Sequence, residues 1–250
     1  MPGNSHAVVF VNGIIGVDGL LGIIPGIRYF NGVERALRDL PVDVHFAKVP
    51  TGETIEKRAG VLADIIRVTN ASSVAVIAHS MGGIDSREVI SRHAEGERIY
   101  RLVTIATPHR GTPISPWILT SRKPWWRIIG RWISSGLQQL DVEACKDFNA
   151  RTLDREGVRY ESYACVRPIE EMPFWGRGLA RVMQASCGAN DSLVCSESAI
   201  WGEFLGDLPT DHLEVAGWSI GLPSRRRKRP FDHRTFYRDL VQRIISEWDG

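Results

Sequence analysis

Short continuous apolar runs alternate with amphipathic stretches along most of this chain. Apolar runs bounded by turn formers are typical of strands that helices cover on both faces. Five segments read as such strands: 7–11, 44–49, 74–78, 101–106 and 158–164. Four segments repeat apolar residues at helical spacing: 32–40, 54–69, 81–93 and 234–248. This alternation predicts an α/β fold with a mostly parallel central sheet, right-handed crossovers and helices on both faces.

One segment, residues 113–140, departs from this pattern. It contains four of the eight tryptophans and four basic residues but no acidic residue. Five apolar positions fall on one face of a helix: Trp125, Ile128, Ile129, Trp132 and Ile133. Such a helix can simply pack on the core, but basic residues beside a tryptophan-rich face are typical of a helix that meets lipid. We therefore expect a lid or cap insertion at 113–140.

Composition limits the classes of protein to consider. With 250 residues and 43% hydrophobic content, we expect a single domain over 1–250 that contains the 113–140 insertion. A net charge of +2 gives no reason to expect a nucleic-acid partner. The longest apolar stretch, 14–27, is interrupted by glycine, aspartate and proline and is shorter than the roughly 20 residues of a membrane span, so no transmembrane segment is expected.

The chain's start and its cysteines suggest a compartment. No leader-like segment precedes the first apolar run, so we expect a cytoplasmic protein, with secretion left open if a leader has been removed. The four cysteines lack metal-ligand spacing. A Cys187–Cys195 bridge is one option; buried free thiols are favoured.

The segment Val76–Gly83 (VIAHSMGG) carries the strongest chemical signal. An apolar strand ends there in Ser80, and small residues flank the serine. This is typical of a nucleophile elbow, a strand-to-helix turn that exposes the serine hydroxyl. Ala78 stands where the general motif has glycine, a departure of one methyl group.

A serine nucleophile requires a base and an orienting acid, which follow in the order serine, acid, histidine in this kind of fold. Of the histidines, only His212 and His233 lie far enough downstream, and His212 is favoured because it lies in a short polar turn. Asp191 is the favoured acid, since it lies among turn formers before an apolar pair. Its rivals are further loop carboxylates: Glu197, Asp207 and Asp211.

An oxyanion hole needs two backbone amides already aimed at the reacting carbonyl. We expect one from Met81, directly after the nucleophile. The other is expected from Ile14, in the turn after the first strand, where Gly13 allows close approach of the backbone.

Five segments, in order, resemble motifs of the α/β-hydrolase fold lipases, specifically the lid-bearing bacterial true lipases and the related fungal triacylglycerol-lipase-like proteins. They are NGIIGVD (12–18), AHSMGG (78–83), ATPHRG (106–111), NDSLV (190–194) and DHLE (211–214). The resemblance implies the α/β-hydrolase fold without the leading strands of larger relatives, and a catalytic triad of Ser80, Asp191 and His212. Asn12 replaces the family's histidine before the oxyanion glycine. Ser192 replaces its glycine after the acid.

The resemblance also implies a function: a carboxylic ester hydrolase, foremost a triacylglycerol lipase working through an acyl-enzyme at an oil–water or membrane interface. The alternatives are a short-chain carboxylesterase, a phospholipase and, more remotely, a non-catalytic lipid-binding protein. Expected substrate-binding residues are Ile15, Leu21, Trp117, Trp125, Ile129 and Trp132. The apolar run 172–175 is a further candidate wall of the acyl pocket, and the basic run 225–229 either contacts anionic headgroups or is a solvated loop.

No cofactor is expected to be required. Some of these lipases hold a structural calcium ion near the triad histidine. The corresponding ligand here is Glu214, with Glu170 or Glu171 as a second. Calcium needs six or more oxygen ligands, and ordinary solvated carboxylates are the favoured interpretation.

Overall fold

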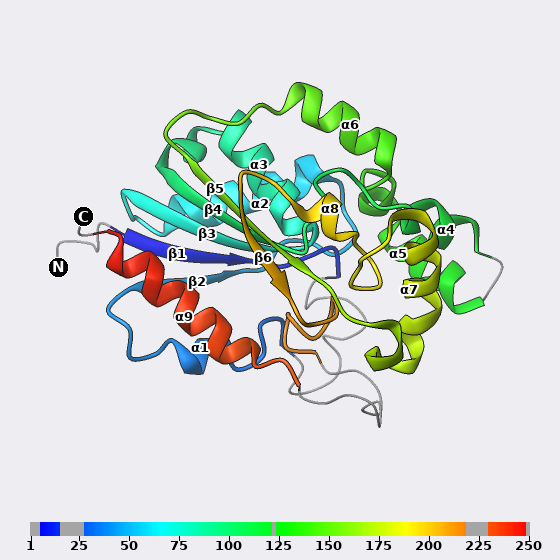
Figure 1. Cartoon of the computed structure of the whole chain (residues 1–250). Coiled ribbons are helices and arrows are strands. Elements are labelled where there is room, and N and C mark those ends of the chain that lie inside the picture. The colour runs from blue at the N-terminus through cyan, green and yellow to red at the C-terminus, as the bar shows by residue number, and fades with distance from the viewer. Residues whose placement is uncertain (1–5, 16–27, 122–123, 219–229, 249–250) are drawn as a thin grey trace.

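A six-stranded parallel sheet forms the centre of the molecule (Figure 1). The computed structural model describes residues 6–15, 28–121, 124–218 and 230–248. The strands are β1 (His6–Val11), β2 (Asp43–Ala47), β3 (Ser73–His79), β4 (Ile99–Ile105), β5 (Arg159–Cys165) and β6 (Glu203–Leu208). Their order is β2-β1-β3-β4-β5-β6, and every pairing is parallel. The predicted fold class is confirmed.

Helices cover both faces of this sheet. On one face lie α2 (Ile55–Val68) and α3 (Met81–Arg92), and on the other lie α1 (Val33–Ala36) and α9 (His233–Ser246), below the sheet in Figure 1. Side chains alternate along β1: Val9 packs with α2 and α3, whereas Phe10 packs with α1 and α9. Both side chains are fully buried, which explains why the central strands are continuous apolar runs.

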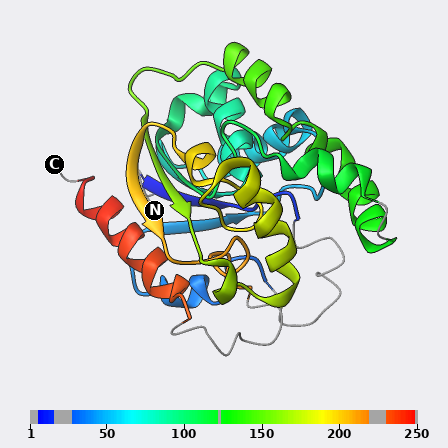
Figure 2. The same ribbon diagram turned by 45° about the vertical axis from the view of Figure 1, so that its right-hand side comes forward.

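Three helices lie together beside the carboxyl ends of the strands, at the right of Figure 1. They are α4 (Ile114–Thr120), α5 (Pro124–Gln138) and α7 (Phe174–Cys187). Figure 2 shows the same grouping after a 45° turn. Their buried apolar side chains form one cluster, against which Ile14 of the turn after β1 also packs. We call these three helices the cap.

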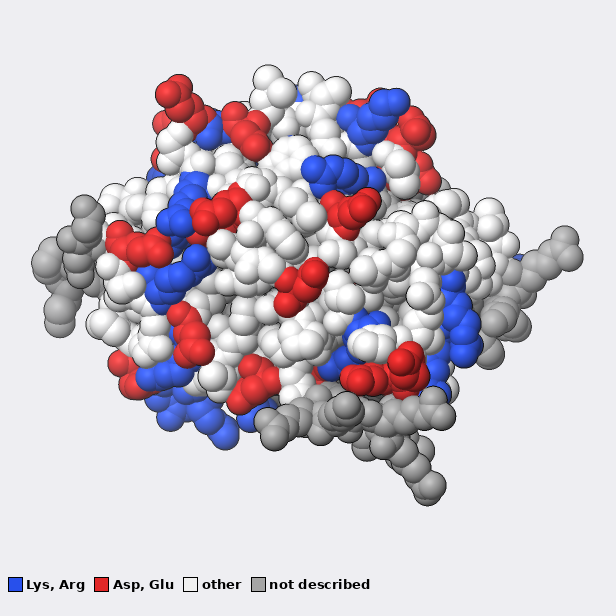
Figure 3. All heavy atoms as spheres, viewed as in Figure 1, with Lys and Arg blue, Asp and Glu red and all other residues white. Residues whose placement is uncertain are grey.

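The remaining elements connect these layers. They are the helices α6 (Val142–Arg151) and α8 (Ser196–Ala199) and the 3₁₀ turns η1 (Ala94–Arg98) and η2 (Ile169–Glu171). Among the described residues, no helix is long and apolar enough to cross a membrane. Acidic and basic side chains are interspersed on the face that Figure 3 shows, in keeping with the small net charge.

Two expectations need correction. The helix expected over 32–40 is limited to the four residues of α1, because the chain turns after Leu37 and reaches Pro41 before β2. Cys187 and Cys195 are not free thiols but form a disulfide with their Cα atoms 6.1 Å apart. The end of α7 and the start of α8 bring them together. Cys145 and Cys165 are buried free thiols.

Candidate active site

Ser80 lies at the sharp turn between β3 and α3. Its backbone has φ 55° and ψ −132°, a conformation that costs free energy for any residue with a β-carbon. The two glycines that follow allow this turn to pack. A β-carbon on Gly82 would lie 2.7 Å from the carbonyl oxygen of Asn12, and one on Gly83 would collide with Thr107. The sequence therefore places small residues where α3 passes against β1 and the loop after β4.

The structure brings Ser80, His212 and Asp191 into one hydrogen-bonded chain. His212 Nδ1 lies 2.7 Å from Asp191 Oδ2, and His212 Nε2 lies 3.0 Å from Ser80 Oγ. A carboxylate can only accept, so Nδ1 carries the proton and Nε2 is left to accept from the serine hydroxyl. This is the arrangement in which an imidazole can act as a general base toward a serine.

The loop of Asp191 is organised around its carboxylate. Oδ1 of Asp191 accepts the backbone N–H groups of Leu193 (2.9 Å) and Val194 (2.7 Å). Its backbone carbonyl accepts the N–H of His212 at 3.1 Å. Asp191 is fully buried and His212 is 4% exposed, so the pair is shielded from water, which strengthens their electrostatic interaction.

The turn after β1 lies against the nucleophile. A β-carbon on Gly13 would come within 2.9 Å of Ser80 Cβ, so only glycine allows this approach. The N–H of Gly13 donates to Tyr29 Oη at 2.9 Å. Within the described part of the chain, the amides of Ile14 and Met81 donate no hydrogen bond. These two amides are the ones expected from the sequence to form the oxyanion hole.

Tyr29 connects this turn to His79, the residue before the nucleophile. Tyr29 Oη lies 2.5 Å from His79 Nδ1, and the rings of His79 and His212 are 4.7 Å apart. Burial, with a smaller contribution from His212, lowers the pKa of His79 well below its usual value. His79 is therefore neutral at pH 7 and places no positive charge beside His212. Sequence reasoning missed Tyr29, since its partners come from two distant segments, the turn after β1 and the end of β3.

The rivals for base and acid have other partners. His233 Nε2 bonds to the carbonyl of Asn31 at 2.7 Å. Asp207 accepts from Ser196 Oγ at 2.8 Å, and Glu197 is exposed. Asp211 pairs with Arg167, with 2.7 Å between Oδ2 and Nη1. None of the four lies in the chain that links Ser80 to His212.

The residues proposed for substrate binding fall into three groups. Ile15 and Trp117 are half-buried, in the turn after β1 and in the cap. Trp132 is 58% exposed on α5. Leu21 and the basic run 225–229 lie outside the described residues, as do the side chains of Trp125 and Ile129. In the run 172–175, Met172 is buried and Phe174 is exposed.

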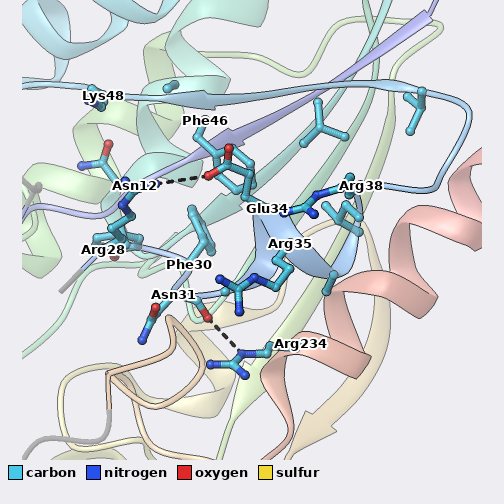
Figure 4. Close-up of a pocket in the computed structure, with 17 residues that line it drawn as sticks. Asn12, Arg28, Phe30, Asn31, Glu34, Arg35, Arg38, Phe46, Lys48 and Arg234 are labelled. Atoms are coloured by element: carbon cyan, nitrogen blue, oxygen red, sulfur yellow. Dashed lines mark hydrogen bonds and ion pairs between the residues drawn. The ribbon is translucent and has the colours of Figure 1, made fainter. Parts of the chain in front are cut away.

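A separate hollow of about 1090 Å³ lies beside β2 and α1 (Figure 4). Its lining includes Phe30 and Phe46 and five basic residues: Arg28, Arg35, Arg38, Lys48 and Arg234. Ser80, Asp191 and His212 are not among the residues that line it. Asn12 and Tyr29 line it too, so these two residues connect the hollow to the turn against Ser80.

Comparisons with known proteins agree with this architecture. A PGAP1-like α/β domain matches residues 42–119, the segment from β2 through the elbow to α4. Triacylglycerol lipase 2 of Saccharomyces cerevisiae is 32% identical over 213 residues, which is 78% of this chain and 64% of that protein. In sequence the chain is similar to triacylglycerol lipases, and its fold is the α/β-hydrolase fold. It spans somewhat less than two thirds of the length of this yeast relative.

Solved structures resemble this lipase-like chain over almost its whole length. The crystal structure of a metagenomic carboxyl esterase superposes with a TM-score of 0.78 and 17% identity, covering 98% of this chain and 78% of the esterase. The lipase of Staphylococcus hyicus superposes with a TM-score of 0.72 and 18% identity, covering 100% and 98%. At these identities the likeness concerns the fold.

Proposed function

We propose that this protein is a serine carboxylester hydrolase that cleaves lipid esters, foremost triacylglycerols. One observation carries the proposal: the hydrogen-bonded chain from Asp191 through His212 to Ser80. The yeast relative, a named triacylglycerol lipase, supports lipid esters as the substrate class.

The chemistry follows from this geometry. Ser80 Oγ attacks the acyl carbonyl carbon while His212 Nε2 takes the hydroxyl proton, and Asp191 stabilises the imidazolium that forms. The amides of Ile14 and Met81 donate to the tetrahedral oxyanion. Collapse breaks the ester bond, and the leaving alcohol takes the proton from His212, which leaves an acyl-enzyme. Water, deprotonated by His212, then attacks the acyl carbon and releases the carboxylic acid and Ser80.

Ser80 is only 5% exposed, and substrate must reach its hydroxyl. The end of α5 is fixed, since Gly136 N–H donates to the carbonyl of Gly52 at 2.9 Å and the helix packs against Met81 there. Earlier in α5, Ile128 and Trp132 are 65% and 58% exposed. We propose that residues 113–132 open as a lid at a lipid surface, hinged before Ile133.

Rates over a series of acyl chain lengths, each ester presented below and above the concentration at which it forms an interface, test this function. A triacylglycerol lipase gives its highest rates on emulsified long-chain esters. Highest rates on short monomeric esters would instead indicate a carboxylesterase. The variant Ser80→Ala should lose at least about 10⁴-fold in turnover; near-wild-type cleavage by a folded Ser80→Ala protein would refute the mechanism.

A further inference from the structure

Arg167 lies between the two loops that hold His212 and Asp191. It follows β5 in the chain, and its side chain is only 2% exposed. Its backbone N–H donates to the carbonyl of Asn190, next to Asp191, at 3.3 Å. Its guanidinium extends in the other direction, into the loop of His212. One residue thus contacts the neighbours of both the acid and the base.

In the His212 loop, the guanidinium binds two buried carboxylates. Nη1 lies 2.7 Å from Asp211 Oδ2, and Nη2 pairs with Glu214 Oε2. Nη2 also donates to the carbonyl of Pro209 at 3.2 Å. The two carboxylate side chains are 5% and 3% exposed. Because these partners lie on both sides of His212 in the chain, the guanidinium clamps the loop at its start and at its end.

The carboxylates are in turn held by the loop itself. Asp211 Oδ1 accepts the N–H groups of Leu213 (3.1 Å) and Glu214 (3.0 Å). Glu214 accepts from the hydroxyl of Thr210 (3.1 Å) and from the N–H of Phe231 (3.2 Å). A bidentate guanidinium fixes orientation as well as charge, which a single-point cation does not.

Glu214 is also the position at which the resemblance places a calcium ligand, and the residues present do not fit that ion. The carboxylate of Glu214 already binds the Arg167 guanidinium, the Thr210 hydroxyl and a backbone N–H. A calcium ion needs six to eight oxygen ligands, and a cation held at the same carboxylates repels a second one. Within the described residues, no group of three or more metal-binding side chains is found. Glu170 and Glu171, the two alternatives for the second ligand, lie on η2, where Glu170 is exposed and Glu171 is half-buried.

We infer that Arg167 is the positioning residue of the active site: its guanidinium fixes the His212 loop from within the chain, and the enzyme therefore needs no divalent cation. The inference rests on the proposed function, since it assigns His212 as the base. Arg167 acts only by fixing the position of His212, because its guanidinium contacts Asp211 and Glu214 and not the reacting atoms.

The wild-type protein provides a first test that needs no variant. Hydrolysis of a soluble short-chain ester and the thermal midpoint are measured in EDTA and in millimolar calcium. We expect both quantities to be unchanged between the two conditions. A lower midpoint or a lower rate in EDTA, restored by calcium, would overturn the inference.

The variants Arg167→Gln and Arg167→Lys test the positioning role. In Arg167→Gln we expect kcat to fall about 100-fold with KM for the soluble ester unchanged, since a misplacement of the base by about 1 Å has an effect of that order. Arg167→Lys keeps the charge but not the fork, and should recover part of kcat. A folded Arg167→Gln protein with wild-type kcat would overturn the inference. If Arg167→Gln does not fold, the kcat of Arg167→Lys and the measurements in EDTA and calcium still test the inference.

Two controls separate this inference from the proposed function. Arg159 on β5 makes half-exposed ion pairs with Glu203 and Glu247 at 3.0 and 2.9 Å, and Arg159→Gln should keep wild-type kcat. Ser80→Ala is assayed beside it. If Ser80→Ala is active, the proposed function fails; if Ser80→Ala is inactive while Arg167→Gln matches wild type, only the role of Arg167 fails.

Discussion

Cys187 and Cys195 are joined by a disulfide across the loop that carries Asp191. The two residues are eight positions apart, and Asn190 and Cys195 also form a backbone bridge within the loop. Asp191 therefore lies in a short covalently closed ring between α7 and α8. The position of the acid relative to His212 depends on this ring as well as on hydrogen bonds.

Replacing both cysteines by serine should destabilise the protein by about 2–3 kcal/mol, the loop-closure value for a ring of this size. We also expect a lower kcat, since the Asp191 loop gains freedom. Urea unfolding and ester hydrolysis, each with and without reductant, measure the two effects. The wild type should respond to reductant and the double variant should not; an equal response of both proteins would contradict the role of the disulfide.

Ser192, directly after Asp191, combines two unfavourable features. Its φ is 90°, where glycine is favoured, and its buried hydroxyl makes no hydrogen bond within the described part of the chain. We expect Ser192→Gly to stabilise the protein by about 1–2 kcal/mol. Ser198→Gly is the control and should destabilise it, because the Ser198 hydroxyl donates to the carbonyl of Gly111 at 2.6 Å. The free energies of unfolding in urea test both.

Much of the fold, and the residues of the candidate site, could be predicted because each depends on local sequence. The central strands are buried on both faces, so their sequences are continuous apolar runs. The elbow needs Ser80 between small residues at fixed positions, and chain order then leaves only His212 and His233 as bases. The geometry favours the choice made from the sequence, since His212 contacts Ser80.

The rest depends on contacts between distant segments or on weak local signals. β6 is an edge strand in which only Leu208 is buried, so it lacks an apolar run. In α6 only Cys145 and Phe148 are buried, too few to give an apolar stripe. The clamp at Arg167 could not be foreseen, because a single arginine after a strand does not specify which carboxylates it will meet.

Gly82 tests how closely α3 must approach the turn after β1. In Gly82→Ala the new β-carbon would lie 2.7 Å from Asn12 O and 2.9 Å from Val11 O, so the backbone must shift. We expect a loss of about 1–3 kcal/mol in stability and a lower kcat. Gly60→Ala in α2 is the matched control: its β-carbon meets nothing within 4 Å, and helix propensity should add about 0.5–1 kcal/mol. Opposite signs in urea unfolding are the expected result.

We expect the buried side chain of His109 to make the stability of the protein depend on pH. Its side chain is fully buried and contacts Thr104 Oγ1 at 3.0 Å, and burial, followed by the charges of Arg87 and Arg110, lowers its pKa well below 6.5. Below pH 6.5 the unfolded chain binds a proton at His109 that the folded protein does not. Stability is therefore lost as pH falls, by up to about 1.4 kcal/mol per pH unit for this residue. His79 contributes in the same direction.

The variant His109→Gln removes this titrating group and should therefore lose less stability than the wild type between pH 6.5 and 5. Urea unfolding at several pH values in this window measures the slope for each protein. The difference between the slopes belongs to His109, because His79 is present in both. Equal slopes would mean that His109 is protonated in the folded protein.

The exposed apolar residues of α5 test the lid. Ile128 and Trp132 lie one helical turn apart, beside the exposed Arg127 and Arg131, as expected of a helix that meets a lipid surface. The double variant Ile128→Ser/Trp132→Ser should lose about tenfold or more in rate on emulsified triacylglycerol, since each buried apolar side chain contributes about 1.5–3 kcal/mol at such a surface. Its rate on a monomeric short-chain ester should stay at the wild-type value. The control is Val68→Ser, which removes a 70% exposed side chain from α2 and should change neither rate. An equal loss of rate on both substrates in the double variant would argue against a lid at α5.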